Sequence, residues 1–346
     1  MKKLLVLFLL FILLTSCAPP NREEGAGEPQ REEYTLGDYY PFWEATLLSY
    51  SGEGSKYAEQ EVYFDFIKGD RAQVRIFNPG TYIGKIIEIG EGEIRERVSI
   101  GEFYGLRDIR DMNGDGDIIL KEPIEEGNSW TLEDGRKRYI SGVDVEIETP
   151  FDNFRGIEVT TEAESSTVKD YYVGGVGHVR SLFVSEGGQE IEVFLDDIVE
   201  GRGVDYPIRF FYPNFHDGEI VYVDRGVEFR TNWDITELFE ENLRDLPSDE
   251  LSPMLGPNAE IRSISLDGGE GILEVDFTRS LVTEMNAGAQ LEEMIIQSIV
   301  NTLGRHYGMY RVLITLEGKR YESGHIILEE GEYFEVDESG VRPFEN

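Results

Sequence analysis

The stretch VYFDFIKGDRAQVRIFNPGTYIGKIIEI, residues 62–89, contains three apolar runs separated by short polar breaks. Within the runs at 62–67, 72–77 and 82–89, β-branched and aromatic residues recur at about every second position, which is typical of strands that bury one face. Glycine, asparagine and aspartate in the breaks suit the backbone of tight turns. The stretch therefore predicts consecutive antiparallel strands.

The same pattern extends over residues 38–200. Further short apolar or alternating runs lie at 143–148, 156–161 and 191–195, and no convincing long amphipathic helix interrupts them. Because such runs are bounded by turn-forming residues, they indicate strands rather than pieces of one buried helix. We therefore expect 38–200 to form a mostly antiparallel β domain.

Residues 205–328 mix strands with helices. Strands are predicted from apolar runs at 207–212, 219–223, 261–266, 272–277 and 312–316. Asp234 is expected to cap one helix. The strongest helix signal covers 287–303; its apolar stripe predicts packing into a core, and Gly304 is expected to end it. The predicted fold class is therefore α+β: the β domain, then a small α/β domain, with 329–346 as a C-terminal tail.

The N-terminal residues have the pattern of a bacterial lipoprotein signal. A basic start precedes an apolar stretch at 4–14, and small residues stand before Cys17. The stretch is shorter than the roughly 20 residues that a membrane span needs. We expect a signal peptide at 1–16, lipidation of Cys17, and a flexible tether at 17–37 that holds the protein on the extracytoplasmic face of the cell membrane. In a cell with two membranes, Ala18 after the lipidated cysteine would permit sorting to the outer membrane.

Composition excludes several classes of partner and site. The formal net charge of the 346 residues is -37, so the surface repels nucleic acid and anionic lipid headgroups. The acids are spread along the chain, which favours a role in solubility over an acidic surface for a basic partner. Cys17 is the only cysteine, so a disulfide, a thiol nucleophile and a thiolate metal site are excluded in the mature chain. The four histidines lack a zinc-binding spacing.

One acidic segment fits the calcium-loop template D-x-[DN]-x-[DN]-G-x5-E. Its candidate ligands are Asp111, Asn113, Asp115, Asp117 and Glu122, with a glycine at the position of the sharp turn. A hard cation such as Ca²⁺ takes six to eight oxygen ligands, which alternate residues can supply. The segment is followed directly by a proline and a strand-like run, so a turn in an acidic protein stays open as the alternative. No cofactor is required by the sequence; calcium is the one candidate.

Within the second domain, several short motifs recur in a distinctive order. They are LGPNAEI at 255–261, Ser263 and Ile264, LEVDF at 273–277, IVNTL at 299–303, VLI at 312–314, Gly318, Gly324 and His325. In this order and spacing, 205–328 resembles the GerMN domain of lipoproteins in sporulation and spore germination. The resemblance implies a small α/β module, similar to ring-building domains of envelope complexes, that binds other proteins and carries no recognised catalytic residues. The first domain resembles β-rich bacterial lipoprotein domains to which no activity is attached.

Three polar residues in this second domain have a structural interpretation. Asn301 and Thr302 are expected to cap or terminate the long helix, and Asp276 is expected at a turn after a strand. Polar side chains near the ends of helices and strands usually satisfy backbone groups. The three residues are therefore expected to have structural roles.

Two classes of function follow from these patterns. The leading hypothesis is a non-enzymatic surface lipoprotein that docks onto envelope proteins, in sporulation or germination, with Trp43, Trp130 or Tyr310 as anchors if they are exposed. The alternative is a lipoprotein whose β domain binds a glycan, lipid or peptide, which predicts a deep apolar pocket among its strands. A hydrolase is disfavoured because the chain has no nucleophile motif such as G-x-S-x-G.

Overall fold

The computed structural model describes residues 34–267 and 269–345. The predicted signal peptide, the lipidation site Cys17 and most of the predicted tether lie outside the described residues. The tether was expected to reach Gly37, but the folded part already includes the short 3-10 helix η1 (Leu36–Tyr39), whose Leu36 is buried. No helix in the described ranges is both long and apolar enough to cross a membrane.

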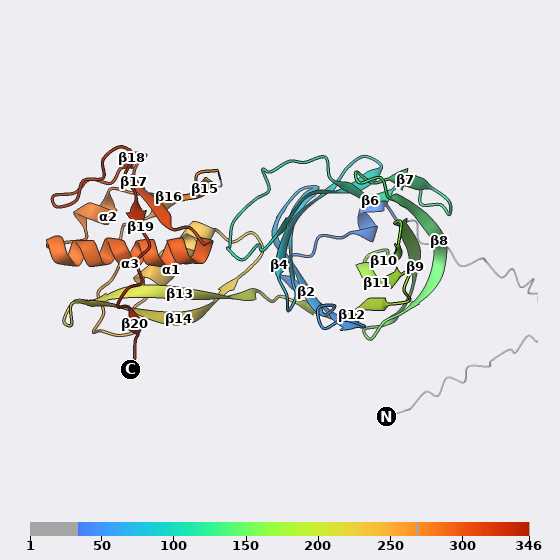
Figure 1. Ribbon diagram of the computed structural model, residues 1–346, viewed down its shortest axis with the longest axis horizontal. Helices are drawn as coiled ribbons and strands as arrows, with labels where there is room; N and C mark the ends of the chain where they lie inside the picture. The colour runs from blue at the N-terminus through green and yellow to red at the C-terminus, as the bar shows by residue number, and fades with distance from the viewer. Residues whose placement is uncertain (1–33, 268, 346) are drawn as a thin grey trace, which may run out of the picture. The chain divides into compact units, whose positions relative to one another are not determined.

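The first domain is a twelve-stranded antiparallel sheet, which we call the rolled sheet (Figure 1). Its strand order is β6-β5-β4-β3-β2-β1-β12-β11-β10-β9-β8-β7. The strands are β1 (Thr46–Glu53), β2 (Gln60–Lys68), β3 (Arg71–Phe77), β4 (Tyr82–Ile89), β5 (Glu93–Gly101), β6 (Asp117–Lys121), β7 (Ser129–Thr131), β8 (Lys137–Glu148), β9 (Asn153–Glu162), β10 (Ser166–Val173), β11 (Gly177–Ser185) and β12 (Glu190–Glu200). The strands predicted from 62–89 are confirmed as β2, β3 and β4.

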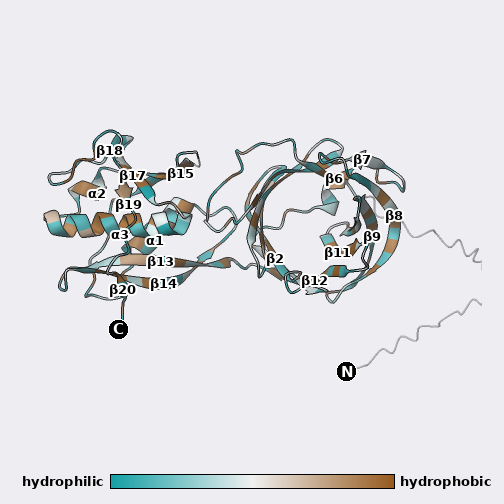
Figure 2. Cartoon of the chain, viewed as in Figure 1, coloured by the Kyte–Doolittle hydropathy of each residue, from teal (hydrophilic) through white to brown (hydrophobic). Residues whose placement is uncertain are grey.

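The rolled sheet curls into an incomplete cylinder. Figure 1 shows β6 and β7, the two ends of the strand order, beside each other. Side chains close the gap: Trp130 Nε1 donates to the carbonyl of Ile118 at 3.0 Å, and Arg138 Nε donates to that of Ile119 at 3.0 Å. Hydrophobic and hydrophilic residues alternate along the strands, as Figure 2 shows. This alternation gives the sheet one face toward its interior and one toward its surroundings.

The second domain places a long helix between two sheets, as Figure 1 shows. One sheet contains β13 (Val204–Asn214), β14 (Glu219–Phe229) and β20 (Arg342–Pro343). The other contains β15 (Ile261–Asp267), β16 (Ile272–Phe277), β17 (Arg311–Leu316), β18 (Lys319–Arg320) and β19 (Phe334–Glu335). The helices are α1 (Ile235–Arg244), α2 (Ser280–Thr283) and α3 (Ala289–Tyr307). As predicted, Asp234 caps α1, because its carboxylate accepts from the amide of Thr236 at 2.8 Å.

The long helix α3 differs from the prediction at its C-terminal end. It runs through Gly304 to Tyr307, and Gly308 in the left-handed conformation ends it. A Cβ at position 304 would lie 2.8 Å from the carbonyl oxygen of Met309 and would also collide with Val336. The glycine at 304 is therefore needed for close packing inside the domain, and not as a helix stop.

Polar residues near the end of α3 connect it to other elements. Thr302 Oγ1 accepts from the amide of Phe211 in β13 at 3.0 Å. Asn301 is fully buried; its side-chain oxygen accepts from the amide of Asp337 at 2.9 Å, and its NH2 group donates to the Asp337 carbonyl at 2.6 Å. Neither residue terminates the helix, which corrects the expectation. Asp276 lies within β16 rather than in a turn of its own, and its carboxylate accepts from the amide of Gly318 at 2.8 Å, in the turn after β17.

Residues 329–346, which were predicted to be a C-terminal tail, include strands that pair with the second domain. Within this predicted tail, β19 pairs antiparallel with β17, and β20 pairs parallel with β14. The segment from Phe334 to Pro343 is therefore part of the second domain, held at its centre by Asn301.

Asn301→Ala should lower the free energy of unfolding by about 2 kcal/mol, because the fully buried Asn301 side chain and both of its hydrogen bonds to the backbone of Asp337 are lost. Amide exchange in β19 and β20 should rise at the same time, as the segment detaches locally. Denaturant unfolding and hydrogen exchange check both effects. Asn153→Ala, at an exposed position of β9, is the matched control and should change the free energy by less than about 0.5 kcal/mol. Equal effects of the two substitutions would contradict the assigned role.

The two domains share one hydrophobic core. Leu47, Tyr63, Phe66 and Leu106 from the first domain belong to the same buried cluster as residues of β13, β14 and α3. Backbone groups join the domains as well: the amide of Thr231 donates to the hydroxyl of Tyr63 at 3.0 Å. The boundary between the domains is therefore a packed contact, which we call the junction.

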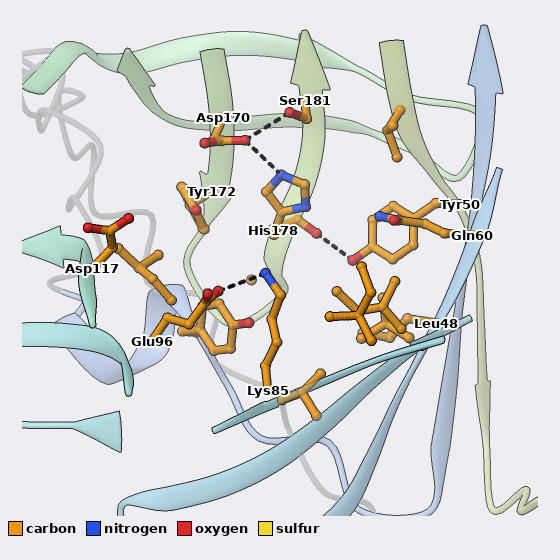
Figure 3. Close-up of a pocket in the computed structure, with 18 of the residues that line it drawn as sticks. Leu48, Tyr50, Gln60, Lys85, Glu96, Asp117, Asp170, Tyr172, His178 and Ser181 are labelled. Atoms are coloured by element: carbon orange, nitrogen blue, oxygen red, sulfur yellow. Dashed lines mark hydrogen bonds and ion pairs between the residues drawn. The ribbon is translucent and has the colours of Figure 1, made fainter. Parts of the chain in front are cut away.

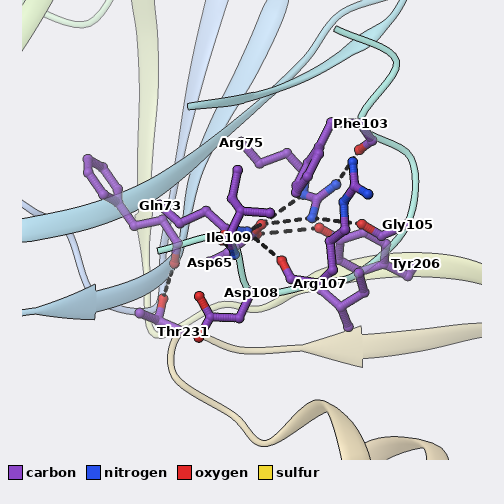
Figure 4. Close-up of polar contacts among 12 residues, drawn as sticks. Asp65, Gln73, Arg75, Phe103, Gly105, Arg107, Asp108, Ile109, Tyr206 and Thr231 are labelled. Carbon is purple, nitrogen blue, oxygen red and sulfur yellow. Dashed lines mark hydrogen bonds and ion pairs between the residues drawn. The ribbon is translucent and has the colours of Figure 1, made fainter. Parts of the chain in front are cut away.

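A buried ion pair lies at the junction (Figure 4). Arg75 NH2 is 2.8 Å from Asp65 Oδ2, and both side chains are completely inaccessible to solvent. Gln73 donates to the same carboxylate oxygen at 2.8 Å, and Tyr206 of the second domain donates to the other at 3.4 Å. The guanidinium also lies over the ring of Phe103, 4.3 Å from its centroid. Hydrogen bonds from both domains thus compensate the charge of Asp65, and carbonyls of the first domain accept from Arg75.

Candidate functional site

The interior of the rolled sheet contains a cavity of about 540 Å³ (Figure 3). This volume falls within the range of roughly 300–1,000 Å³ that small-molecule sites occupy. Strands β1 to β4 supply an apolar wall, made of Leu48, Val62, Phe64, Val74, Ile76 and Ile83. The segment after η1 adds Tyr40, Pro41 and Trp43. Trp43 is fixed in place because its indole N–H donates to the carbonyl of Val176 at 3.3 Å.

Asp170 is the centre of a polar cluster on β8, β10 and β11. Its carboxylate accepts from Ser181 Oγ at 2.8 Å, lies 3.0 Å from Arg138 NH2, and lies 3.5 Å from His178 Nε2. Burial alone would raise the pKa of Asp170, but the hydrogen bonds from His178 and Ser181 and the charge of Arg138 hold it well below its usual value. Asp170 is therefore ionised, and it orients the three side chains around it.

The Asp170 cluster contains the residue types of a serine hydrolase in a different arrangement. A serine nucleophile needs a base that accepts its proton. Here Ser181 donates to Asp170, and the imidazole of His178 faces the same carboxylate. The serine and the histidine are thus both bound to the aspartate, and the serine is not activated by the histidine. The expectation of a non-enzymatic protein stays a prediction.

Arg138 is bonded mainly to protein partners. Besides Asp170 and the carbonyl of Ile119, it donates to Thr161 Oγ1 at 2.8 Å and to the hydroxyl of Tyr172 at 3.2 Å. Burial raises the pKa of Tyr172, and the charge of Asp170 raises it further, so the phenol stays neutral. These groups form a fixed polar floor of the cavity.

A second charged pair in the cavity has unused hydrogen-bonding capacity. Lys85 Nζ of β4 lies 2.7 Å from Glu96 Oε2 of β5, and Figure 3 shows the pair projecting into the cavity. About a quarter of each side chain is solvent-exposed, 25% and 24%. Each makes this single side-chain bond within the described residues, so two N–H groups of the lysine and the second carboxylate oxygen stay open. Gln60 at the same cavity has no side-chain partner among the described residues.

The candidate calcium ligands are bonded mainly to protein groups. Asn113 Oδ1 accepts from Arg71 NH1 at 2.9 Å, and Arg95 NH1 donates to the carbonyl of Asp115 at 2.7 Å. Two arginines thus already supply positive charge to this loop. The side-chain oxygens of Asp111 are not bonded to this network, while its carbonyl accepts from Asn113.

The two remaining candidate ligands also lie apart. Asp117 begins β6, and its Oδ1 accepts from the amide of Glu133 at 2.9 Å. Glu122 follows the end of β6, where its amide donates to the carbonyl of Gly92 at 2.9 Å. Across the described part of the chain, no group of three or more His, Cys, Asp or Glu side chains is placed to hold a metal ion. Calcium binding by this loop stays a prediction, which this arrangement does not support.

The aromatic residues considered as partner anchors lie in three environments. Trp130 is buried in the rolled sheet, and Trp43 lines the cavity. Tyr310 is 60% exposed on the second domain, as an anchor for a protein partner would be.

Sequence reasoning missed Lys85, Glu96 and Asp170, because charged residues in an acidic chain resemble ordinary surface positions.

Residues 210–322 match the family Germane, described as "Sporulation and spore germination". The second domain is therefore a Germane domain, as the sequence motifs indicated. A solved exported protein of YmcC-like fold from Bacteroides fragilis aligns with 11% identity over 47% of this chain and 99% of its own, at a TM-score of 0.31. A lipoprotein structure from Parabacteroides distasonis aligns with 12% identity over 46% of this chain and 98% of its own, at a TM-score of 0.28. No curated protein matches the sequence.

Proposed function

We propose that this protein is an extracytoplasmic lipoprotein whose rolled sheet binds a small ligand. The observation that carries the proposal is the cavity of about 540 Å³, which combines an apolar wall with polar groups that have unused hydrogen-bonding capacity. Recognition sites for small molecules combine an apolar lining with placed polar groups, and this cavity has both. Lipidation at Cys17 would hold the site outside the cell membrane.

Val62→Trp should place an indole in the cavity beside the apolar wall and weaken the binding of a small apolar probe at least about tenfold. Val62 lies on the cavity side of β2, whereas its neighbour Glu61 is exposed. Glu61→Trp adds the same indole outside the cavity and is the matched control. Titration with an uncharged naphthalene dye, whose fluorescence rises in apolar surroundings, measures the affinity.

Circular dichroism and thermal unfolding show whether both tryptophan variants are folded. If the dye binds the folded Val62→Trp variant as tightly as the original protein, the cavity is not the site. If the dye fails to bind the original protein at all, the apolar wall does not hold a small apolar molecule, which counts against the proposal.

A second role is proposed for the Germane domain, namely docking onto other envelope proteins in sporulation or spore germination. The family match supports this role, and Tyr310 and Ile327 are exposed on the domain, at 60% and 62%. A photocrosslinking amino acid at position 310 should capture an envelope protein in the native cell. The same group at Tyr57, 52% exposed on the first domain, is the control. Capture from both positions alike, or from neither, would speak against docking through this surface.

A further inference from the structure

We propose that the cavity takes a zwitterionic ligand with an apolar body, namely an apolar amino acid or a short apolar peptide. The inference rests on the proposed function, since it requires that the cavity binds a small molecule. It is carried by the ion pair of Lys85 and Glu96 and by the apolar wall on β1 to β4.

The pair of Lys85 and Glu96 places opposite charges side by side, 2.7 Å apart, at the cavity surface. A ligand with an ammonium and a carboxylate can align antiparallel to this pair, so that its carboxylate meets Lys85 and its ammonium meets Glu96. Both contacts are charge-assisted hydrogen bonds, which are shorter and stronger than neutral ones. The unused N–H groups and carboxylate oxygen supply these bonds while the pair itself stays intact.

A ligand with a single charge is less suited to the cavity. An anion would gain a charge-assisted contact with Lys85, but it would lie near Glu96 and the ionised Asp170. A cation would gain a charge-assisted contact with Glu96, but it would lie near Lys85 and Arg138. Because water is partly excluded from such a site, the like-charge contacts cost more than they would in bulk solvent. The net charge of -37 further disfavours anions before they reach the cavity.

The apolar wall would contact the apolar body of the ligand. Val62, Phe64 and Val74 project from β2 and β3 into the cavity, on the side where Lys85 enters from β4. Burial of methyl and methylene groups against this wall contributes roughly 25 cal/mol per Å² of area. The volume of about 540 Å³ leaves space for more than one residue beside the charged ends.

Calorimetric titration of the full mature chain with alanyl-leucine and two derivatives tests the ligand class. N-acetylation leaves the same peptide an anion, and C-terminal amidation leaves it a cation. The zwitterion should bind at least about tenfold more tightly than either derivative, because only it makes both charge-assisted contacts.

Two substitutions at the ion pair give a signature that general damage to the fold cannot produce. Lys85→Gln should weaken the zwitterion about tenfold and shift the preference toward the amidated cation, since Glu96 stays. Glu96→Gln should weaken it similarly and shift the preference toward the acetylated anion. Lys137→Gln, at an exposed lysine of β8, is the matched control and should leave all three affinities unchanged.

The outcomes separate this inference from the proposed function. Equal binding of the three peptides, or the same preference in both variants, would overturn the zwitterionic class. The zwitterionic class would also be overturned if none of the peptides binds while the dye binds the original protein and not the Val62→Trp variant. The cavity would then still be a ligand site. If neither dye nor peptide binds the original protein, the proposed function itself fails.

Discussion

Arg75→Met should lower the free energy of unfolding of the whole chain by about 3–5 kcal/mol, because it leaves a buried carboxylate without its counter-charge. Asp65 has no access to solvent, and Gln73 and Tyr206 alone would have to compensate its charge. The loss should affect both domains at once, since they share one core. Denaturant unfolding followed by tryptophan fluorescence and by circular dichroism should therefore give one coincident transition, shifted as a whole.

Two further variants test the cause of this loss. Arg155→Met removes an exposed arginine that pairs with Asp144 at 2.7 Å, and it should cost less than about 1 kcal/mol. The double variant Asp65→Leu with Arg75→Met removes both buried charges and should regain part of the stability that Arg75→Met loses. A loss from Arg75→Met no greater than that from Arg155→Met would refute the role assigned to the buried pair.

Acidification should destabilise the protein through His306 before most carboxylates titrate. The imidazole Nε2 accepts from the amide of Leu106 at 2.9 Å, so it must be unprotonated in the folded state. Burial lowers the pKa of His306 from 6.5 to about 4, and the positive charge of Arg75 adds to the effect. The rings of Phe239 and Tyr307 pack against the imidazole, with centroids 5.2 and 4.8 Å away.

Because the pKa of His306 is lower in the folded state, the unfolded chain binds the proton more readily. The stabilising contribution is therefore complete above about pH 6.5 and is lost as the pH falls toward about 4, by roughly 2 kcal/mol between about pH 7.5 and 5. His306→Gln, whose amide oxygen can accept from Leu106, should remove most of this slope. Unfolding measured across the interval checks it, with the exposed His216→Gln as control. An unchanged slope in His306→Gln would assign the effect to another group.

The strands and the cap of α1 could be predicted because they depend on local pattern. The period of two in residues 62–89 reflects the alternation of side chains in a strand, whatever the strand packs against. The alternation is interrupted in β2, where the register shifts between Phe64 and Phe66, so that Phe64 packs inside the rolled sheet and Phe66 packs at the junction. The pattern could not show that the outer face of this strand is covered by the second domain, because Tyr206 lies far along the chain.

The position of the helix end was predicted wrongly, and the calcium loop stays a prediction, because in both cases the local sequence suits two different roles. Gly304 and Gly308 both follow apolar helical residues, but one is required by close packing and the other by a left-handed backbone. The spacing from Asp111 to Glu122 suits calcium, yet arginines from neighbouring strands supply positive charge there. Only the folded chain shows which neighbour each residue meets.

The shared core of the two domains has an evolutionary consequence. A module joined by a flexible linker can be exchanged by recombination without harm to its neighbour. Here, a foreign first domain would leave Tyr206 and Thr231 without Asp65 and Tyr63, their partners across the junction. Descendants of this chain should therefore inherit both domains together, and substitutions at Asp65, Arg75 and Tyr206 should be accepted as sets rather than singly.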